Sequence, residues 1–387
     1  MPDGHEQFNI SLCESLTDVP AQSWDACAGT ENPFLSHTFL SSLEDAGCIT
    51  PETGWVTRHI LIKDQHGTLL ACAPLYLKGN SMGEYVFDWN WAEAFERAGG
   101  NYYPKLICAV PFTPATGPRL LVNGSLSPVL QFELKHQLVT AMANFASRAH
   151  LSSLHVNFIS EDDRDVFVDT KYLHRVGIQY HWNNNDYQSY NDFLNALTSR
   201  KRKALKKERR LAKDGLTIHR LNGNQIQAHH WDAMYQFYMD TSTRKWGRPY
   251  LNREFFALLG ERMAEQILLI LAERDGIIIA GAMNLIGKDA LFGRYWGCLE
   301  EIRFLHFELC YHQAIDEAIE RGLKRVEAGA QGEHKIARGY LPVLTHSAHY
   351  IVDENFRGAI AEFLNHEKHA IEHEYALLMQ DSPYRQS

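Results

Sequence analysis

The sequence predicts an α/β protein built from two similar halves, and three observations lead to this prediction. The chain has 387 residues, which is more than a single hydrophobic core usually holds, so two domains are expected. Its composition, with 45% hydrophobic and 22% charged residues, is typical of a globular enzyme. The third observation is that one pattern, a β-hairpin with flanking helical sequence, occurs twice along the chain.

The repeated pattern is clearest in two stretches of apolar residues on either side of a glycine turn. Residues 59–77 and residues 267–286 each predict a β-hairpin, with Gly67 and Gly276 at equivalent places in the turn. Glycine-containing hairpins are common in α/β proteins, so this likeness alone leaves open that the halves are unrelated. Helical sequence precedes the hairpins at residues 36–46, 231–238 and 252–265.

The boundary between the halves is predicted near residue 187. A polar stretch of turn-forming residues, 187–192, leads into a helix that Asn191 or Ser189 can cap and Gly215 can end. We therefore expect an N-terminal half over residues 1–187 and a C-terminal half over residues 188–387. No Pro-rich or low-complexity linker separates them, so they are expected to pack tightly.

Charge, cysteine usage and hydropathy restrict location and partners. The net charge of −9 makes the whole molecule repel polyanions, so contact with nucleic acid or phosphate must be local. Seven widely spaced cysteines without a C-x-x-C pair predict reduced thiols in a cytoplasmic protein. The N-terminal sequence lacks the basic and apolar regions of a signal peptide, and no run of about 18 apolar residues predicts a transmembrane helix.

A basic helix predicted at about residues 192–214 offers such a local contact. Residues 199–213 concentrate lysine and arginine in an otherwise acidic chain. The outward face of this helix suits phosphate, whether of tRNA, of a nucleotide-linked precursor or of CoA. A charge run of this kind is also commonly no more than a solvated surface. The apolar stripe of the helix is predicted to consist of Phe193, Leu197, Ala204 and Leu211.

A strand–helix–strand unit predicted over residues 290–297, 304–320 and 324–330 is the next candidate region. Such units form clefts at the ends of their strands, where backbone groups are free to hold a ligand. The alternative is an ordinary strand–helix–strand unit without a site. The cleft residues are expected to include Arg294, Tyr295, Trp296 and Glu327.

On the predicted helix 304–320, angular position separates two polar residues. Glu308 falls within the apolar face, whereas His306 falls on the opposite side with Gln313 and Glu317. A buried carboxylate needs a partner or a raised pKa, so we expect Glu308 either to pair with an arginine or to act as a base, and we rank it above His306. The apolar face is predicted to contain Phe304, Phe307, Tyr311, Ile315 and Ala318.

The glycine-rich stretch 329–339 is the first choice for the active site. Its glycines permit close backbone approach to a ligand, and its polar residues can donate, accept or carry protons. Glu333 and His334 are candidate bases. The alternative is a polar surface loop. Ligand contacts are expected from Gly329, Gln331, Gly332, Lys335 and Arg338.

Other catalytic signatures are missing from the sequence. It contains no G-x-S-x-G elbow, no G-x-G-x-x-G and no Walker-type phosphate loop. His366, His369 and His373 are spaced along the last predicted helix, but they project away from its apolar side, so no metal site is expected. Direct attack by an amine, assisted by a base and an oxyanion donor, is the chemistry that remains.

Several long strings resemble bacterial predicted N-acyltransferases of the Fem-type branch of the GNAT superfamily. The resemblance covers most of the chain and implies two tandem GNAT-like halves with mixed sheets flanked by helices. It also implies that Arg202 and Lys206 face phosphates of tRNA or of the acceptor. One departure is that no clean Q/R-x-x-G-x-G/A loop for acyl-CoA precedes a helix. The strings are residues 32–40, 83–91, 102–106, 201–210, 293–297 and 327–335.

The predicted function is N-acyl transfer from a CoA thioester or an aminoacyl-tRNA ester to an amine, such as that of a peptidoglycan-type or other small peptide. Glu333, His334 and Glu308 are the base candidates, and Tyr295 is expected to donate to the leaving group. No tightly bound cofactor is expected, and a homo-oligomer is compatible with the sequence. The alternative is a non-catalytic GNAT-like protein that binds a peptide, a nucleotide or tRNA in the same cleft.

Overall fold

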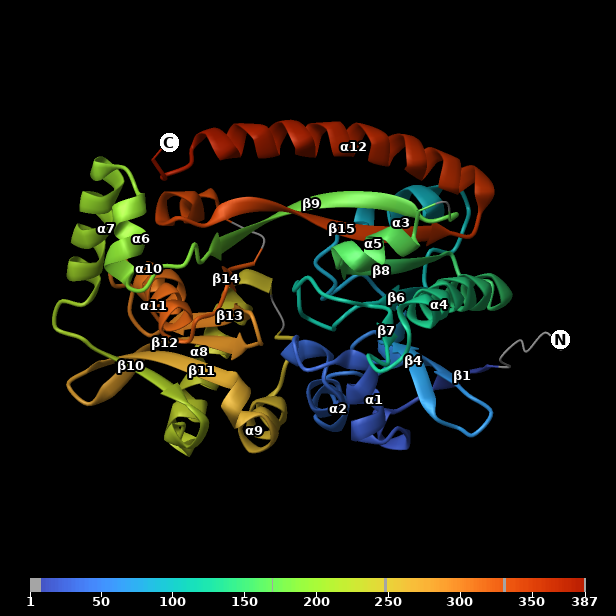
Figure 1. The fold of residues 1–387 in the computed structure, drawn as a ribbon, viewed down its shortest axis with the longest axis horizontal. Helices are drawn as coiled ribbons and strands as arrows, with labels where there is room; N and C mark the ends of the chain where they lie inside the picture. The colour runs from blue at the N-terminus through green and yellow to red at the C-terminus, as the bar shows by residue number, and fades with distance from the viewer. Residues whose placement is uncertain (1–7, 169, 247–248, 330–331, 386–387) are drawn as a thin grey trace. The chain divides into compact units, whose positions relative to one another are not determined.

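The structure of the protein, a computed structural model, describes residues 8–168, 170–246, 249–329 and 332–385 (Figure 1). Its elements form two compact units. The first comprises the chain up to Gly177 together with Thr345–Ile371, and the second comprises Ile178–Leu344 and the chain from Glu372 onward. The chain therefore passes between the units more than once, whereas the division predicted near residue 187 contains a single passage.

The first unit contains two sheets. In one, the strand order is β1-β3-β4-β7, and in the other β15-β8-β6-β5-β2 are neighbours in that order. The elements up to β8 are β1 (Asn9–Cys13), α1 (Ala21–Ala28), α2 (His37–Asp45), β2 (Trp55–Thr57), β3 (His59–Lys63), β4 (Leu69–Ala73), β5 (Leu75–Lys78), α3 (Trp89–Arg97), β6 (Lys105–Cys108), β7 (Leu121–Val122), α4 (Pro128–Arg148) and β8 (Ser153–Ile159). They are followed by α5 (Glu161–Val166) and by parts of β9 (Leu173–Asn183), β15 (Leu341–Ile351) and α12 (Glu354–Gln380).

The second unit is organised around strands in the order β10-β11-β12-β13-β14-β9. Its helices before the hairpin are α6 (Tyr190–Ala196), α7 (Ser199–Ala212), α8 (Ala228–Trp246) and α9 (Arg253–Arg262). Its strands include β10 (Thr217–Asn222), β11 (Ile267–Arg274), β12 (Ile277–Ile286), β13 (Ala290–Cys298) and β14 (Arg325–Glu327). Between β13 and β14 lie α10 (Leu305–Phe307), the π-turn η5 (Glu308–His312) and α11 (Gln313–Glu320), and after β14 comes the 3-10 segment η6 (Glu333–Arg338).

The two units share a topology, which confirms the predicted hairpins. β3 pairs with β4 and β11 with β12, both antiparallel, and the turn residues Gly67 and Gly276 have φ angles of 84° and 80°, a region that glycine enters at little cost. β1 is antiparallel to β3 as β10 is to β11. A helical connection then leads to a short parallel pair in each unit, β6 with β8 and β13 with β14.

Helices cover both faces of the sheet in the second unit. On one face, a Cβ added at Gly297 would meet the Phe237 backbone at 2.4 Å, so α8 lies directly against β13. On the other face, Leu268 and Ile270 of β11 share a buried core with Leu309 and Ile315, which lie between β13 and β14 in sequence. Alternate residues of each strand therefore pack against different helices, as the period of a strand requires.

The basic segment predicted as one helix is two helices; Phe193 and Leu197 of its predicted apolar stripe are buried, but the stripe does not continue into the second helix. Leu197 and Thr198 have extended backbone angles, so α6 ends before α7 begins and the helical phase restarts. Of the two predicted caps, Ser189 caps α6. The buried residues of α7 are Leu205, Glu208 and Ala212, whereas Ala204 is exposed.

The predicted apolar face of the 304–320 helix is confirmed for Tyr311, Ile315 and Ala318, which are buried, whereas its predicted outer side is wrong. The π-turn inserts an extra residue into the helical repeat, which changes the direction of the side chains on either side of it. Gln313 and Glu317, predicted to point outward, are buried. His306, predicted to lie opposite the apolar face, packs its ring 5.4 Å from that of Tyr311.

The last helix, α12, buries Ile360, Leu364 and Leu378, whereas Phe363 is 41% exposed. Its three histidines are exposed. Among the described residues, no group of three His, Cys, Asp or Glu side chains is arranged to hold a metal ion. No helix in the described part of the chain is long and apolar enough to cross a membrane.

Candidate functional site

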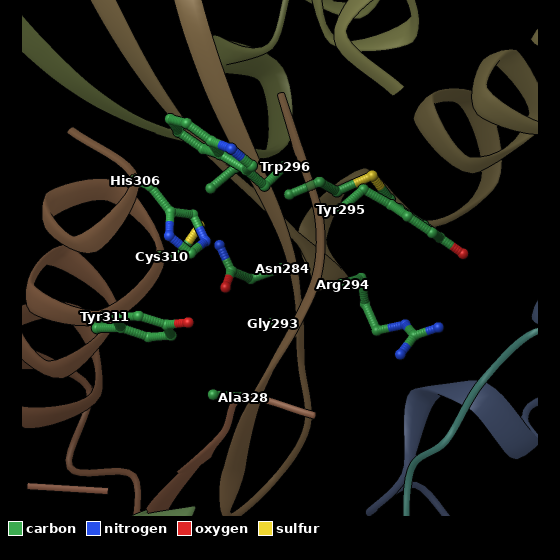
Figure 2. A pocket seen from close by; sticks show the side chains of 11 residues that line it. Asn284, Gly293, Arg294, Tyr295, Trp296, His306, Cys310, Tyr311 and Ala328 are labelled. Atoms are coloured by element: carbon green, nitrogen blue, oxygen red, sulfur yellow. The ribbon is translucent and has the colours of Figure 1, made fainter. Parts of the chain in front are cut away.

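The second unit contains a pocket where β13 and β14 part. The two strands are paired only from residues 290 to 292 of β13, and beyond Gly293 this edge of β13 has no partner in β14. Ala328 instead continues β14 toward Tyr180 of β9, to which its N–H donates at 3.3 Å. The opening holds a pocket of about 120 Å³ (Figure 2). It is lined by Ala282, Met283, Asn284, Gly293, Arg294, Tyr295, Trp296, His306, Cys310, Tyr311 and Ala328.

The sheet side of the pocket is shaped by a bulge in β13, where the pairing with β12 skips Arg294. The register between β12 and β13 shifts between Met283 and Asn284, and Asn284 lies opposite Gly293. Bulges of this kind redirect side chains and recur beside active sites. The Asn284 side chain is directed into the pocket (Figure 2) although the residue is only 1% exposed, and its Nδ2 has no hydrogen-bond partner among the described residues.

The helical side of the pocket carries His306, Cys310 and Tyr311. The Trp296 ring lies 5.1 Å from that of His306, so aromatic surfaces close this side. The Tyr311 hydroxyl is 3.1 Å from Nε2 of His334, which itself lies outside the lining. His334 is exposed, yet partial desolvation, followed by the nearby Arg338 charge, lowers its pKa, so its imidazole is neutral at pH 7.

Three residues predicted from the end of β13 do line the pocket, but in different ways. Trp296 faces the helical side, whereas the Tyr295 ring packs 5.1 Å from Tyr238 of α8 and points away from His306 and Tyr311 (Figure 2). Arg294 places its guanidinium carbon 5.4 Å from the centre of the Tyr295 ring. The predicted Tyr295 hydroxyl is therefore not directed at the same space as the helical residues.

Glu327, predicted as a ligand contact, is buried at the end of β14 and does not line the pocket. Arg325 donates from Nε to its Oε1 at 2.8 Å, and Nε2 of His181 lies 3.8 Å from its Oε2. Burial lowers the pKa of His181. The geometry makes Glu327 part of the wall behind the pocket.

No described residue of the glycine-rich stretch 329–339, the first choice for the active site, lines the pocket; its described residues are divided between the interior and the surface. Lys335 is buried, and its Nζ donates to the carbonyl oxygens of Ala328 at 2.6 Å and Gly329 at 3.1 Å. Burial lowers the pKa of Lys335 to about 8. Gly332 has φ 105°, and a Cβ there would lie 2.3 Å from the His334 ring. Glu333 is exposed, and Gln331 lies outside the described residues.

Glu308 is a structural anion. It is 0% exposed and accepts hydrogen bonds from Arg209, through Nε at 3.1 Å and Nη2 at 3.0 Å, and from Gln313 at 2.6 Å. Burial opposes its charge, but Arg209 outweighs this, so the pKa of Glu308 is lowered. The expected arginine pair is present, the alternative of a raised pKa is wrong, and Glu308 does not line the pocket.

Arg338, predicted to contact ligand, forms an ion pair with Glu208 of α7. Its Nε and Nη2 donate to the two carboxylate oxygens at 2.8 and 2.7 Å, and Nε2 of His312 lies 2.9 Å from Oε1. The guanidinium carbon also lies 3.4 Å from the centre of the Phe307 ring. Arg338 thus links α7 to the segment that carries His334 and to the π-turn.

The outer face of α7 remains cationic. Arg202 donates to Asn195 at 3.1 Å, and Lys206 is exposed. Arg209, in contrast, is turned inward to Glu308 and Asp316. The exposed basic residues of α7 that form no ion pair with another described residue are Arg200, Lys203, Lys206, Lys207 and Arg210.

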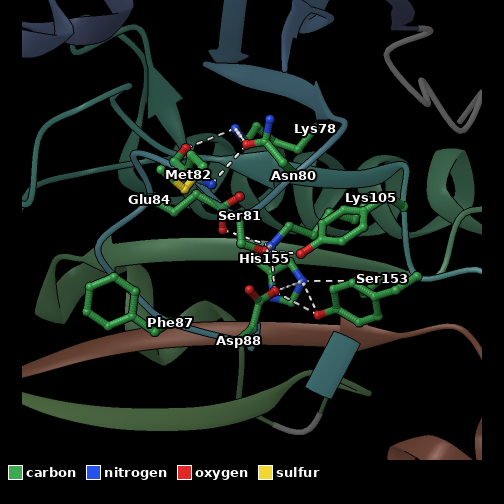
Figure 3. Close-up of polar contacts among 12 residues, drawn as sticks. Lys78, Asn80, Ser81, Met82, Glu84, Phe87, Asp88, Lys105, Ser153 and His155 are labelled. Atoms are coloured by element: carbon green, nitrogen blue, oxygen red, sulfur yellow. Dashed lines mark hydrogen bonds and ion pairs between the residues drawn. The ribbon is translucent and has the colours of Figure 1, made fainter. Parts of the chain in front are cut away.

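The first unit contains a separate buried ionic cluster (Figure 3). Nζ of Lys105 donates to Glu84 at 2.8 Å and also to Asp88, and all three residues are buried. Burial raises the pKa of Glu84 to about 7, whereas Lys105 outweighs burial at Asp88 and lowers its pKa. Burial also lowers the pKa of the neighbouring His155 to about 3. The cluster joins the loop before α3 to β6 and β8.

Fold and pocket together define a class of protein: a tandem α/β chain with the GNAT-like order of elements and an opening between parting parallel strands. A family model for the FemAB-like family, described as peptidoglycan biosynthesis/recognition, matches residues 15–386. The chain therefore belongs to the FemAB-like family. No curated protein matched the sequence.

Several solved structures have a similar fold. The crystal structure of FemX is similar with a TM-score of 0.53 and 12% identity, covering 92% of this chain and 100% of that one. The C-terminal domain of a putative lysylphosphatidylglycerol synthetase from Agrobacterium fabrum has a TM-score of 0.53 and 12% identity over 89% and 95% of the two chains. At such identities the likeness shows the fold.

The site also includes residues that sequence reasoning missed. Asn284, Cys310 and Tyr311 line the pocket, and His306 was ranked below Glu308. Asn284 had a visible signal, since it is the one polar side chain in the apolar run 277–286. Cys310 and Tyr311 had none, because their direction depends on the π-turn.

Proposed function

We propose that the protein is an N-acyltransferase that moves an acyl or aminoacyl group from a CoA thioester or an aminoacyl-tRNA ester to the amine of a peptide. Donor carbonyl and amine would meet in the opening between β13 and β14. The observation that carries the proposal is this pocket, which combines an edge of β13 that is not paired with β14, a buried amide, and a tyrosine hydrogen-bonded to a histidine. The family description, peptidoglycan biosynthesis/recognition, favours a peptidoglycan-type acceptor.

The proposed reaction needs one proton acceptor. A neutral amine attacks the carbonyl carbon, the C–N bond forms, and the C–S or C–O bond to the donor breaks. The amine proton passes through the Tyr311 hydroxyl to Nε2 of His334, and the departing thiolate or alkoxide is protonated in turn. His334 suits this role because its imidazole is neutral at pH 7. Burial raises the pKa of Tyr311, so its hydroxyl acts as a relay rather than as a phenolate.

The cationic face of α7 supports an RNA-linked donor. α7 is held to the π-turn by the Arg209–Glu308 pair, and the π-turn includes the pocket residues Cys310 and Tyr311. A row of exposed lysines and arginines beside the site therefore offers a surface for a phosphate backbone. Arg202 and Lys206, the residues implied by family resemblance, lie on this helix.

Mass spectrometry of the acceptor tests the catalytic proposal. Purified protein is incubated with a nucleotide-linked peptidoglycan stem peptide and either aminoacyl-tRNA or acyl-CoA, and the mass added to the peptide is measured. We expect His334→Ala and Tyr311→Phe to slow transfer by about 100-fold, within the usual range for general base catalysis. His373→Ala, an exposed histidine of α12, is the control and keeps full activity.

Two outcomes would contradict this scheme. Folded His334→Ala and Tyr311→Phe proteins with full activity would remove the proposed relay. Tight binding of donors without any product would instead support the non-catalytic alternative. Glu333→Ala is expected to retain activity, because the proposed relay runs through Tyr311 and His334 and does not include Glu333.

Salt dependence tests the tRNA surface. The double variant Lys206→Glu/Lys207→Glu is expected to weaken aminoacyl-tRNA binding and to reduce the slope of log K against log salt by about 2. The matched control Lys171→Glu/Lys324→Glu changes net charge equally at exposed lysines elsewhere. Equal losses in both double variants would show that net charge, and not this helix face, determines binding.

A further inference from the structure

Asn284 is a buried amide without a partner in a strand that is otherwise apolar. Its neighbours Met283 and Leu285 are each 1% exposed, and Asn284 itself is 1% exposed. The amide Nδ2 forms no hydrogen bond with any described residue. Burying an amide without a hydrogen bond costs about 1 to 3 kcal/mol, so each such group in a folded protein needs an explanation.

The surroundings of this amide direct it at the pocket. The bulge beside this residue lies in the partner strand β13, and Gly293, which has no side chain, stands opposite Asn284. Figure 2 shows the amide between the side chains of His306 and Cys310 and the backbone of Ala328. A ligand in the pocket would therefore meet an N–H donor that is already held in place.

We propose that Asn284 binds the carbonyl oxygen of the acyl donor through its Nδ2–H and so positions the acyl group in the opening. This inference rests on the proposed acyl transfer and specifies a residue for it. When the amine attacks, negative charge develops on the same oxygen, and a donor in a buried site stabilises that charge more strongly than water does. The ligand class is an activated acyl carbonyl, a thioester or an ester.

The residue type fits this role better than the alternatives. An aliphatic side chain would fill the same place in the strand without the cost of an unpaired amide. A carboxylate would repel a carbonyl oxygen. The amide is also short and held by the strand, so little side-chain freedom is lost when a ligand binds.

The first unit supplies a matched control in Asn157 of β8. It is likewise 1% exposed, and neither Nδ2 nor Oδ1 of its side chain has a hydrogen-bond partner among the described residues. It does not line the pocket. Asn157→Ala therefore reproduces the loss of a buried, unpaired amide without removing a group from the proposed site.

The experiment compares ligands that differ by one carbonyl. Affinities are measured for acetyl-CoA against S-ethyl-CoA, and for 3′-O-alanyladenosine against the ether that lacks its carbonyl, so the two arms separate thioester from ester. For the pair of compounds that the wild-type protein binds, we expect its affinity for the compound with the carbonyl to be about tenfold higher, which corresponds to one hydrogen bond. Asn284→Ala and Asn284→Asp lose this preference, and Asn157→Ala retains it.

The possible failures are distinguishable. If the wild-type protein transfers acyl groups and Asn284→Ala keeps the full preference for the carbonyl compound, the role of Asn284 is overturned while the proposed function stands. If the wild-type protein binds neither pair and forms no product, the proposed function fails and the assignment fails with it. If Asn157→Ala loses the preference as Asn284→Ala does, the effect is structural and the assignment is overturned.

Discussion

Replacing Arg209 with methionine tests how the helix beside the pocket is held. Arg209 of α7 is bonded to Glu308 and to Asp316, so it joins α7 to the π-turn and to α11. Its side chain is 14% exposed and that of Glu308 is 0% exposed, so solvent screens this pair only weakly. Methionine keeps much of the apolar stem and removes only the charge and the hydrogen bonds.

The expected loss is large because Glu308 stays behind. Removing one partner of a buried ion pair costs about 3 to 5 kcal/mol, since the other charge is left without compensation. Lys213 at 3.4 Å and Gln313 at 2.6 Å still contact the carboxylate, so we expect the lower end, about 3 kcal/mol in the free energy of unfolding at pH 7. The change should also loosen the helical side of the pocket.

The sign of the pH dependence follows from the pKa of Glu308. In the wild-type protein this pKa is lowered, so its contribution to stability is present above the unfolded value of 4.5 and is lost as pH falls through the folded value. Without Arg209, burial dominates and the folded pKa rises above 4.5. The deficit of Arg209→Met is therefore expected to shrink as pH is lowered from 7 to 5.

The assay is urea denaturation followed by circular dichroism. It compares the single variants Arg209→Met and Glu308→Gln with the double variant Arg209→Met/Glu308→Gln. The double variant is expected to be at least 1 kcal/mol more stable than the sum of the single losses implies, roughly the coupling measured between contacting residues. Glu273→Gln, at a partly exposed carboxylate of β11, is the control. Additive losses and a deficit independent of pH would refute this account of the pair.

Three further variants test other parts of the structure. Glu84→Gln should become more stable relative to the wild-type protein as pH rises from 4.5 to 7, because a folded pKa of about 7 means that wild-type stability is lost over this window; parallel unfolding curves would contradict this. Lys335→Met should become less stable relative to the wild-type protein as pH rises from 8 toward 10.5. The folded pKa of Lys335 is about 8 and the unfolded pKa is 10.5, so the wild-type protein gains stability over this range and the variant does not. Gly332→Ala should slow transfer by displacing the His334 ring, and unchanged rates in a mass-spectrometric assay would show that the loop adapts.

Local chemistry made much of the fold predictable. Alternating apolar residues around Gly67 and Gly276 predicted both hairpins, and Ser189 marked the start of α6. These features depend on residues close together in the sequence, whose periodicity and backbone preferences act over a few residues. The strand–helix–strand unit that carries the pocket was predicted for the same reason.

The content of the site depended on long-range contacts. The pocket exists because β13 extends past its pairing with β14, and no local pattern says where two strands stop pairing. The π-turn then directs Cys310 and Tyr311 toward it, although an ideal helical repeat predicts other directions.

By itself, the sequence determined the two-part α/β architecture, the hairpins and the concentration of positive charge on α7. Only the tertiary structure decided that Arg209 and Arg338 are held by buried carboxylates while Lys206 stays exposed, and that Asn284 faces an open pocket. The physical reason is that composition and periodicity set local conformation, whereas the partner of a charge and the direction of a side chain depend on segments distant in the chain.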